Sequence, residues 1–297
     1  MNRAKELARL TRYPLAPTAA ADVVAAAALF GESASIGRIA LAACGSICLY
    51  AAGMVQNDLA DRRRDEKLHP DRPLVRHPEL LNPARAMVVG LFVLGLLLAS
   101  FADALVPALV VATIVCLYNF GFKRKFPHDA IVMGCARAAN LSVGLVAAGA
   151  TWNTSVFTYL AGYVLFIGGV TAASRAEDME PAQTRRLGTI LSFLPQVLAL
   201  AGFASLFSWE RSSALLVVFA VLLFSVVRSM LAGTREAAIA HVKNSLLTIF
   251  LLHVCCVWAR TADKAEAKLW LPVVILLGAA TFVLMRFAGR DQAAPAE

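Results

Sequence analysis

Four oxygen-bearing side chains recur within residues 57–65: Asn57, Asp58, Asp61 and Asp65. On an α-helix, successive residues are rotated by about 100°, so these side chains share about a quarter of the circumference and about 12 Å of the axis. Three carboxylates on one helix face repel one another unless a positive group lies among them. Carboxylate oxygens suit Mg²⁺, which keeps several of its waters and bridges to phosphate oxygens of a substrate. The spacing therefore indicates a site for a metal ion and a phosphorylated ligand.

The residues around this run end the helix and offer a second interpretation. Pro70 and Pro73 follow it, and proline removes a backbone donor and restricts the residue before it. Three arginines lie between the last two aspartates, at residues 62–64. In a solvated loop, they would pair with aspartates three or four positions away. Such a loop does not require Asn and three Asp in phase, so we favour the binding site, where arginines also offer paired donors to a diphosphate.

The elements that position this run are expected to be membrane helices, because the composition is that of a membrane protein. Apolar residues make up 59% of the 297 residues, charged residues make up 16%, and the mean hydropathy is +0.67. A soluble domain has about half apolar and about a quarter charged residues, so too little charge remains for a water-exposed surface. Apolar stretches long enough to cross a bilayer recur along the chain. We expect them at residues 18–32, 36–57, 84–101, 104–119, 130–150, 156–174, 188–207, 213–231, 238–259 and 269–287.

Two of these segments leave the helix count open. The first is rich in alanine and contains Asp22, which makes it the weakest candidate. The ninth has His241 and Lys243 near its start, which is compatible with a turn or two along the membrane surface. The expected fold is therefore an all-α polytopic bundle of about nine transmembrane helices, with a range of eight to ten.

The placement of the basic residues predicts the orientation. Lys and Arg are concentrated at the N-terminus and in the loops after even-numbered segments, and the loops after the first, third, fifth and seventh segments hold very few. This asymmetry places the N-terminus and the 57–65 run on the cytoplasmic side of the inner (plasma) membrane. The net charge of +8 then reflects topology and not nucleic-acid binding. We expect a basic N-terminus at 1–17, a transmembrane domain at 18–288 and a disordered tail at 289–297.

Two sequence stretches resemble motifs of the UbiA prenyltransferase superfamily. The run N-D-x-x-D-x-x-x-D at 57–65, with Arg72-Pro73-Leu74 after it, is similar to the first aspartate-rich motif of that family at the cytoplasmic end of its second helix. The stretch 118–123, from Tyr118 to Lys123, resembles the tyrosine–lysine element at the end of the fourth helix. The resemblance extends over most of the chain.

The second acidic motif of the family follows its sixth helix, and here the chain departs from the pattern. Glu177, Asp178 and Glu180 offer carboxylates at this place, but the family spacing is absent and Ala182 stands where a further Asp is expected. Four helices separate the two acidic stretches, so both emerge on the same side of the membrane. The chain therefore resembles a divergent member with a degenerate second motif.

The resemblance implies a Mg²⁺-dependent intramembrane enzyme that moves an isoprenyl group from a prenyl diphosphate to an aromatic or other small acceptor. The implied catalytic residues are Asp58, Asp61 and Asp65. The implied diphosphate-binding residues are Asn57, Arg72, Lys123, Arg137 and Asn140. The implied metal ligands are Asn57, Asp58, Asp61, Asp65, Glu177 and Asp178. The implied partners are the prenyl diphosphate, a lipophilic or aromatic acceptor and the bilayer.

Other interpretations stay open at this point. Lys123 is also compatible with an ordinary membrane anchor, and Arg137 with snorkelling to the membrane surface. His241 and His253 are expected to pack in the protein and not to bind a metal. The same bundle with a weakened second motif is compatible with a non-catalytic carrier of a prenylated or aromatic metabolite, or with a structural assembly factor.

Overall fold

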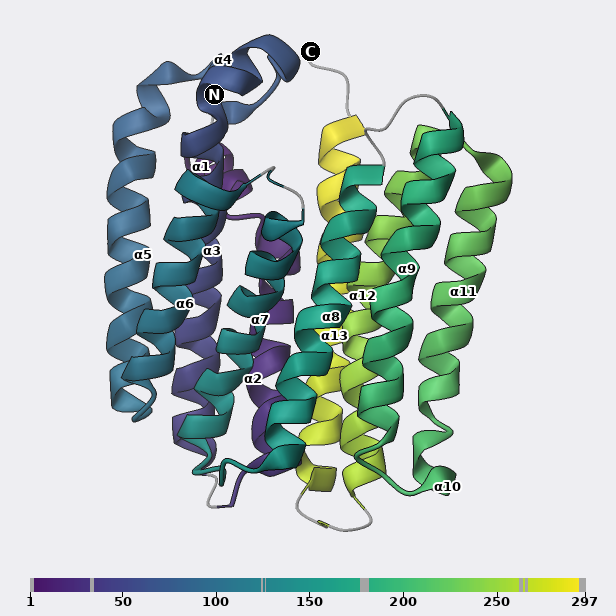
Figure 1. Ribbon diagram of the computed structural model, residues 1–297. Coiled ribbons are helices and arrows are strands. Elements are labelled where there is room, and N and C mark those ends of the chain that lie inside the picture. The colour runs from purple at the N-terminus through teal and green to yellow at the C-terminus, as the bar shows by residue number, and fades with distance from the viewer. Residues whose placement is uncertain are drawn as a thin grey trace.

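The chain folds into a bundle of long helices that run side by side (Figure 1). The computed structural model describes residues 3–32, 35–123, 125, 127–176, 182–261, 264 and 267–293, and every regular element within them is helical. The long helices are α2 (Ala16–Phe30), α3 (Ile36–Leu68), α5 (Leu81–Phe101), α6 (Leu105–Leu117), α7 (His128–Ala147), α8 (Thr154–Ala176), α9 (Ala182–Ala204), α11 (Leu215–Ala232), α12 (Arg235–Arg260) and α13 (Ala267–Ala293). The short elements are α1 (Arg3–Leu10), η1 (Tyr13–Leu15), α4 (Pro73–Arg76), η2 (Pro78–Leu80), η3 (Tyr118–Phe122) and α10 (Trp209–Ser212).

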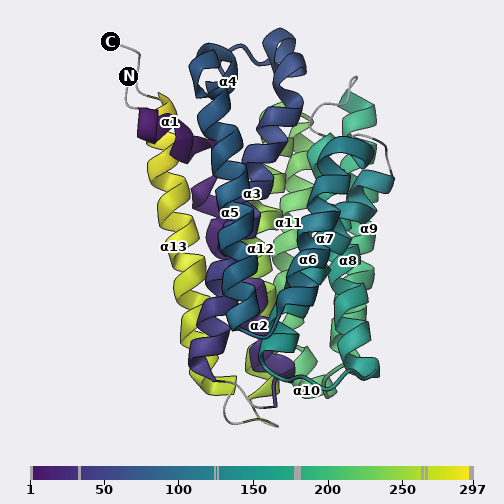
Figure 2. The same ribbon diagram turned by 90° about the vertical axis from the view of Figure 1, so that its left-hand side faces the viewer.

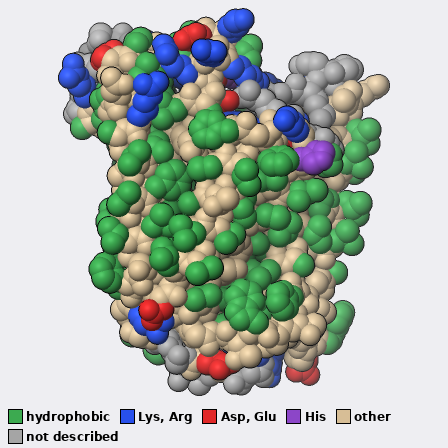
Figure 3. Space-filling model, turned by 60° about the vertical axis from the view of Figure 1, so that its left-hand side comes forward, with side chains coloured by type: hydrophobic (Ala, Val, Ile, Leu, Met, Phe, Trp, Pro, Cys, Tyr) green, Lys and Arg blue, Asp and Glu red, His purple; other side chains and the backbone are tan. Residues whose placement is uncertain are grey.

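The predicted membrane architecture is confirmed. Within the described residues, ten helical stretches are long and apolar enough to cross a membrane. Figure 3 shows a wide belt free of charged side chains on one face of the molecule, with charged side chains at its two ends and most of the Lys and Arg at one of them. Such a belt matches the hydrocarbon layer, where exposed charge is costly. The protein is therefore an all-α, multi-pass membrane protein.

The weakest predicted segment, α2, is the centre of the bundle. It packs against α3, α7, α12 and α13. Of the apolar stretch Tyr13–Phe30, which contains α2, 72% is buried inside the protein. Alanine at most positions lets these neighbours approach closely, as small residues do between membrane helices. Hydropathy alone gave only a weak signal for this helix. A transmembrane helix that is surrounded by protein needs little apolar surface toward lipid.

Helices α7 and α2 approach each other closely at Gly144. A Cβ atom added to Gly144 would lie 2.2 Å from the carbonyl oxygen of Val23. We therefore expect Gly144→Ala to lower the free energy of unfolding by about 1–3 kcal/mol, the usual cost of overpacking. The control is Gly90→Ala on α5, where an added Cβ meets no atom within 4 Å, and it should not destabilise the protein. Thermal unfolding of both variants in detergent tests this prediction, which fails if the two midpoints shift equally.

Helix α3 carries the acidic run beyond the membrane. Its 33 residues extend for about 50 Å, whereas the hydrocarbon layer is about 30 Å thick. It ends at Leu68, immediately before His69-Pro70, as predicted from the prolines. Helices α1 and α4 lie over this end of the bundle (Figure 2), where Leu10 and Leu74 pack against Val55 of α3. The acidic run is therefore enclosed by protein at one end of the bundle.

Candidate active site

The three aspartates of α3 face the protein and not bulk water. Asp58 and Asp65 are 6% and 4% exposed, and the Asp61 side chain is 14% exposed. Glu66 lies outside this face of the helix, where it is exposed and pairs with Arg62. The alternative interpretation, a solvated loop with local ion pairs, therefore applies to Glu66 and not to the three aspartates. The predicted helix face exists and is turned inward.

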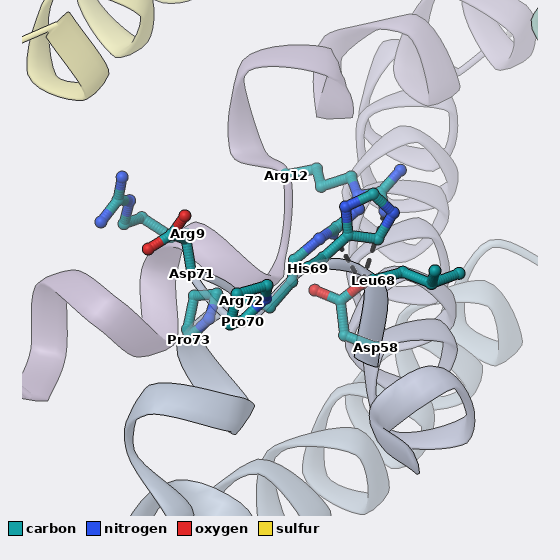
Figure 4. A pocket seen from close by; sticks show the side chains of 9 residues that line it. All are labelled: Arg9, Arg12, Asp58, Leu68, His69, Pro70, Asp71, Arg72 and Pro73. Carbon is teal, nitrogen blue, oxygen red and sulfur yellow. Dashed lines mark hydrogen bonds and ion pairs between the residues drawn. The ribbon is translucent and has the colours of Figure 1, made fainter. Parts of the chain in front are cut away.

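Asp58 is held by two arginines from different parts of the chain. The Oδ1 atom accepts hydrogen bonds from Nη2 of Arg12 and from Nη1 of Arg72, each at 3.4 Å (Figure 4). Both contacts lie in a polar cavity of about 510 Å³. Its lining residues are Arg9, Arg12, Asp58, Leu68, His69, Pro70, Asp71, Arg72 and Pro73. The cavity brings together cationic donors, and these suit a phosphorylated ligand.

Arg12 reaches this cavity through an unusual backbone conformation. Its φ of 48° and ψ of 42° lie in the left-handed region, which costs a residue with a side chain about 1–2 kcal/mol. This conformation joins α1 to η1, and the side chain turns toward Asp58. A strained residue whose guanidinium contacts a buried carboxylate is a candidate functional residue.

Asp61 and Asn57 are bridged by Lys123, whose Nζ donates a hydrogen bond to each of them. Lys123 directly follows η3, a single π-helical turn, and such turns are frequent at functional sites. Asn119 fixes this turn against α3, because its Nδ2 donates to Oε1 of Gln56 at 2.8 Å. The end of α6 is thereby held beside the acidic run, and Lys123 contacts two residues of that run directly.

A second cavity begins beside this group of side chains and continues into the bundle. It has a volume of about 180 Å³ and mostly apolar walls from α3, α6 and α7. Arg12 lines both cavities, and Asn57 and Tyr118 lie on the wall of the second. The polar and apolar spaces therefore share a boundary at Arg12.

Arg137 and Asn140 lie deeper in the bundle, around Asp22. Asp22 is fully buried and forms an ion pair with Nε of Arg137 at 3.2 Å. The Arg137 side chain therefore points to Asp22 in the interior and does not extend to the membrane surface. Asn140 donates to Asp22 at 3.1 Å and accepts from Ser46 at 2.5 Å. Ser46 precedes Asn57 by eleven residues, or about 16 Å of helix. Asn140 is therefore deeper in the bundle than the acidic run, although Asn140, Arg137 and Asn57 all line the second cavity.

Two further helices contribute to the Asp22 network. The Tyr163 hydroxyl of α8 donates to Asp22 at 2.5 Å, and Nε2 of His253 on α12 lies 3.1 Å from it. His253 therefore packs in the interior, as expected, and also joins a polar network. The signal in the sequence was Asp22 itself, because an ionisable residue inside a membrane segment marks a functional candidate.

The chemistry of the acidic face fits a magnesium ion that is shared with a substrate. The Asp65 carboxyl group makes no hydrogen bond or ion pair with another residue in the described part of the chain. Burial raises the pKa of Asp65, whereas the charge of Arg72 nearby lowers it, and a bound cation would favour its charged form further. Among the described residues, no group of three or more His, Cys, Asp or Glu side chains converges on one metal position. Mg²⁺ is usually bound by one or two carboxylates together with substrate phosphates and water. Glu177 and Asp178 lie outside the described residues.

The family of this chain follows from its sequence, and known structures share its fold. Residues 15–268 match the model of the UbiA prenyltransferase family, whereas no curated protein matches the chain significantly. A digeranylgeranylglyceryl phosphate synthase structure has a TM-score of 0.66 at 20% identity, over 88% of this chain and 100% of that one. A UbiA homologue from Archaeoglobus fulgidus bound to GPP and Mg²⁺ has a TM-score of 0.58 at 14% identity, over 95% and 99%. With 254 of its 297 residues matched, the chain belongs to the UbiA prenyltransferase family.

Proposed function

We propose that this protein is a Mg²⁺-dependent prenyltransferase that moves an isoprenyl group from a prenyl diphosphate to a small acceptor inside the membrane. The observation that carries the proposal is the junction at Arg12. A polar cavity with carboxylates and basic side chains meets a mostly apolar cavity there. A prenyl diphosphate has the same division between a charged head and an apolar chain.

The acidic and basic side chains divide the work on the diphosphate. Mg²⁺, held by Asp58, Asp61 and Asp65 with Asn57 and with Glu177 and Asp178 as further candidates, would neutralise charge on the leaving diphosphate as the allylic C–O bond breaks. Lys123 contacts Asp61, and Arg12 and Arg72 contact Asp58. With a cation held by those carboxylates, the three basic side chains would be the donors available to diphosphate oxygens.

The apolar walls protect the reacting carbon. Leu49, Val111, Val115 and Met133 line the second cavity, and these apolar side chains offer water no hydrogen-bond partner. An allylic cation formed at its mouth would meet the acceptor before water. The concentration of Lys and Arg at the N-terminus and in the loops on this side supports our proposal that the mouth faces the cytoplasm, at the inner membrane.

The proposal is tested by product formation with the purified protein in detergent. Labelled C5 to C20 prenyl diphosphates are incubated with a panel of aromatic and hydroxylated acceptors, with Mg²⁺ or with EDTA. A prenylated product and diphosphate release that vanish with EDTA and return with Mg²⁺ support the transferase. Binding of prenyl diphosphate without turnover for any acceptor would instead support a carrier.

Lys123 should contribute strongly to diphosphate binding. Lys123→Ala removes a charged donor at the acidic face, and a hydrogen bond to a charged group contributes about 1.5–3 kcal/mol. We therefore expect the Kd for prenyl diphosphate to rise about 10- to 100-fold. The matched control is Lys125→Ala, two positions along and exposed, which should leave the Kd unchanged. An equal effect of both variants would show only a general loss of positive charge.

A further inference from the structure

A groove of about 490 Å³ lies on the outer side of α3, between α3, η3 and the first turns of α5. Helix α5 stands at the edge of the bundle (Figure 1). On α3, the groove is lined by Leu59 and Arg63, which lie about 150–190° around the helix from the middle of the acidic face. The groove is therefore separate from the candidate active site, although both use the same helix.

Three arginines line this groove, and their positive charge is only partly balanced. They are Arg62 and Arg63, near the end of α3, and Arg85, near the start of α5. Arg62 pairs with Glu66 at 3.3 Å, whereas Arg85 donates to the neutral side chain of Asn82 at 3.2 Å. Arg63 makes no hydrogen bond or ion pair with any described residue. Within the described part of the chain, three guanidinium groups thus share one carboxylate.

Arg62 also has a donor that the protein itself leaves unused. Its Nε atom is buried and has no hydrogen-bond partner among the described residues. Buried donors are nearly always paired in folded proteins. An acceptor bound beside Arg62 would supply the missing partner. Phosphate oxygens suit this role, because guanidinium groups bind them through paired hydrogen bonds.

One helical turn deeper in the bundle, the walls of the groove become apolar. Val89 follows Arg85 by four residues on α5, and Leu59 precedes Arg63 by four residues on α3. Val89 and Phe120 are 63% and 72% exposed, and both belong to stretches that are long and apolar enough to cross a membrane. A phospholipid has the same order, with a charged head group above an apolar chain.

We propose that this groove binds an anionic phospholipid from the leaflet at this end of the bundle. Its phosphate contacts Arg62, Arg63 and Arg85, and an acyl chain lies along Val89 and Phe120. Basic pockets between transmembrane helices are known to bind anionic head groups. A soluble anion would account for the arginines, but not for the exposed apolar side chains directly below them. The inference goes beyond the proposed transferase function and does not depend on it.

Two lipids with the same acyl chains and different head-group charge test this site. The full-length protein in detergent is titrated with phosphatidylglycerol, which is anionic, or with phosphatidylcholine, which is neutral overall. Bound lipid is counted by native mass spectrometry. We expect phosphatidylglycerol to bind about tenfold more tightly, because each arginine at the membrane surface favours anionic lipid. Equal affinity of the two lipids would overturn the proposal.

A soluble head group separates a lipid site from a site for free anions. Glycerol phosphate carries the same phosphate without acyl chains, so it should not displace phosphatidylglycerol at an equal concentration. Displacement at that concentration would show that the groove binds a free phosphate group, and the lipid site would be wrong.

Matched variants test whether the groove itself makes the difference. Arg63→Gln/Arg85→Gln removes two exposed guanidinium groups of the groove, and the preference should fall to within about twofold. The control Arg64→Gln/Arg76→Gln removes the same charge from two exposed residues that do not line the groove, and it should keep the preference. A preference that persists in the first variant, or that is lost equally in both, contradicts the proposal.

Thermal unfolding in detergent gives a second readout. A ligand that binds only the folded protein raises the unfolding midpoint. Phosphatidylglycerol should therefore raise the midpoint of the wild type and of the control, but not that of Arg63→Gln/Arg85→Gln. If that variant does not fold, Arg85→Gln alone should lower the preference by about threefold. An equal rise in all three proteins, or an unchanged preference in Arg85→Gln, would overturn the proposal.

Discussion

Asp61→Ala is expected to lower the rate of Mg²⁺-dependent diphosphate release by about 10²- to 10³-fold, the usual effect of removing one electrostatic stabiliser of a transition state. Asp61 is the carboxylate that Lys123 contacts, and it lies between Asp58 and Asp65 on the inward face of α3. Its loss removes a metal ligand and leaves Lys123 with one partner fewer. The chemical step should therefore suffer more than the affinity for the prenyl chain.

The matched control for this prediction is Glu66→Gln. Glu66 lies on the same helix, five residues further along, but its side chain is exposed. Its neutralisation changes the net charge by the same amount as Asp61→Ala and should leave the rate within about twofold, as for surface substitutions away from a site. Both rates are measured from released diphosphate at saturating Mg²⁺. If Glu66→Gln slows the reaction as much as Asp61→Ala, the inward face has no special role.

Arg137→Gln is expected to destabilise the fold by about 3–5 kcal/mol, because breaking a buried ion pair leaves an uncompensated charge. The charge left behind is Asp22, which is fully buried at the centre of the bundle. The double variant Asp22→Asn/Arg137→Gln removes both charges and keeps polar groups for Asn140, Tyr163 and His253. It should recover most of the lost stability.

A double-mutant cycle measures this coupling. The free energy of unfolding is determined for the wild type, both single variants and the double variant by denaturant titration in detergent. Arg38→Gln serves as the control, because Arg38 pairs with Asp103 at 2.6 Å on the surface, where such pairs contribute less than about 1 kcal/mol. Additive losses in the cycle would contradict a coupled Asp22–Arg137 pair.

Local periodicity and charge were enough to predict the acidic helix face. The phase of Asn57, Asp58, Asp61 and Asp65 on one face of α3, and the end of α3 before His69-Pro70, are properties of a single helix. Hydropathy likewise predicted ten apolar segments and about nine spans, with a range of eight to ten, and ten helical stretches are long and apolar enough to cross a membrane. Each transmembrane helix must be apolar whatever its neighbours are. The roles of the individual side chains in binding and catalysis stay predictions.

The tertiary structure alone decided which distant residues share a site. Arg12 was counted in the sequence only as positive charge, and a left-handed backbone turn brings it to Asp58. Asp22 marked the weakest predicted span, yet its neighbours from α7, α8 and α12 make α2 the core of the bundle. Contacts between helices depend on packing angles and small-residue contacts such as Gly144 against Val23. These angles and contacts are set by all ten helices together. Hydropathy indicates how deep a residue lies in the membrane, but it does not indicate which helix the residue faces.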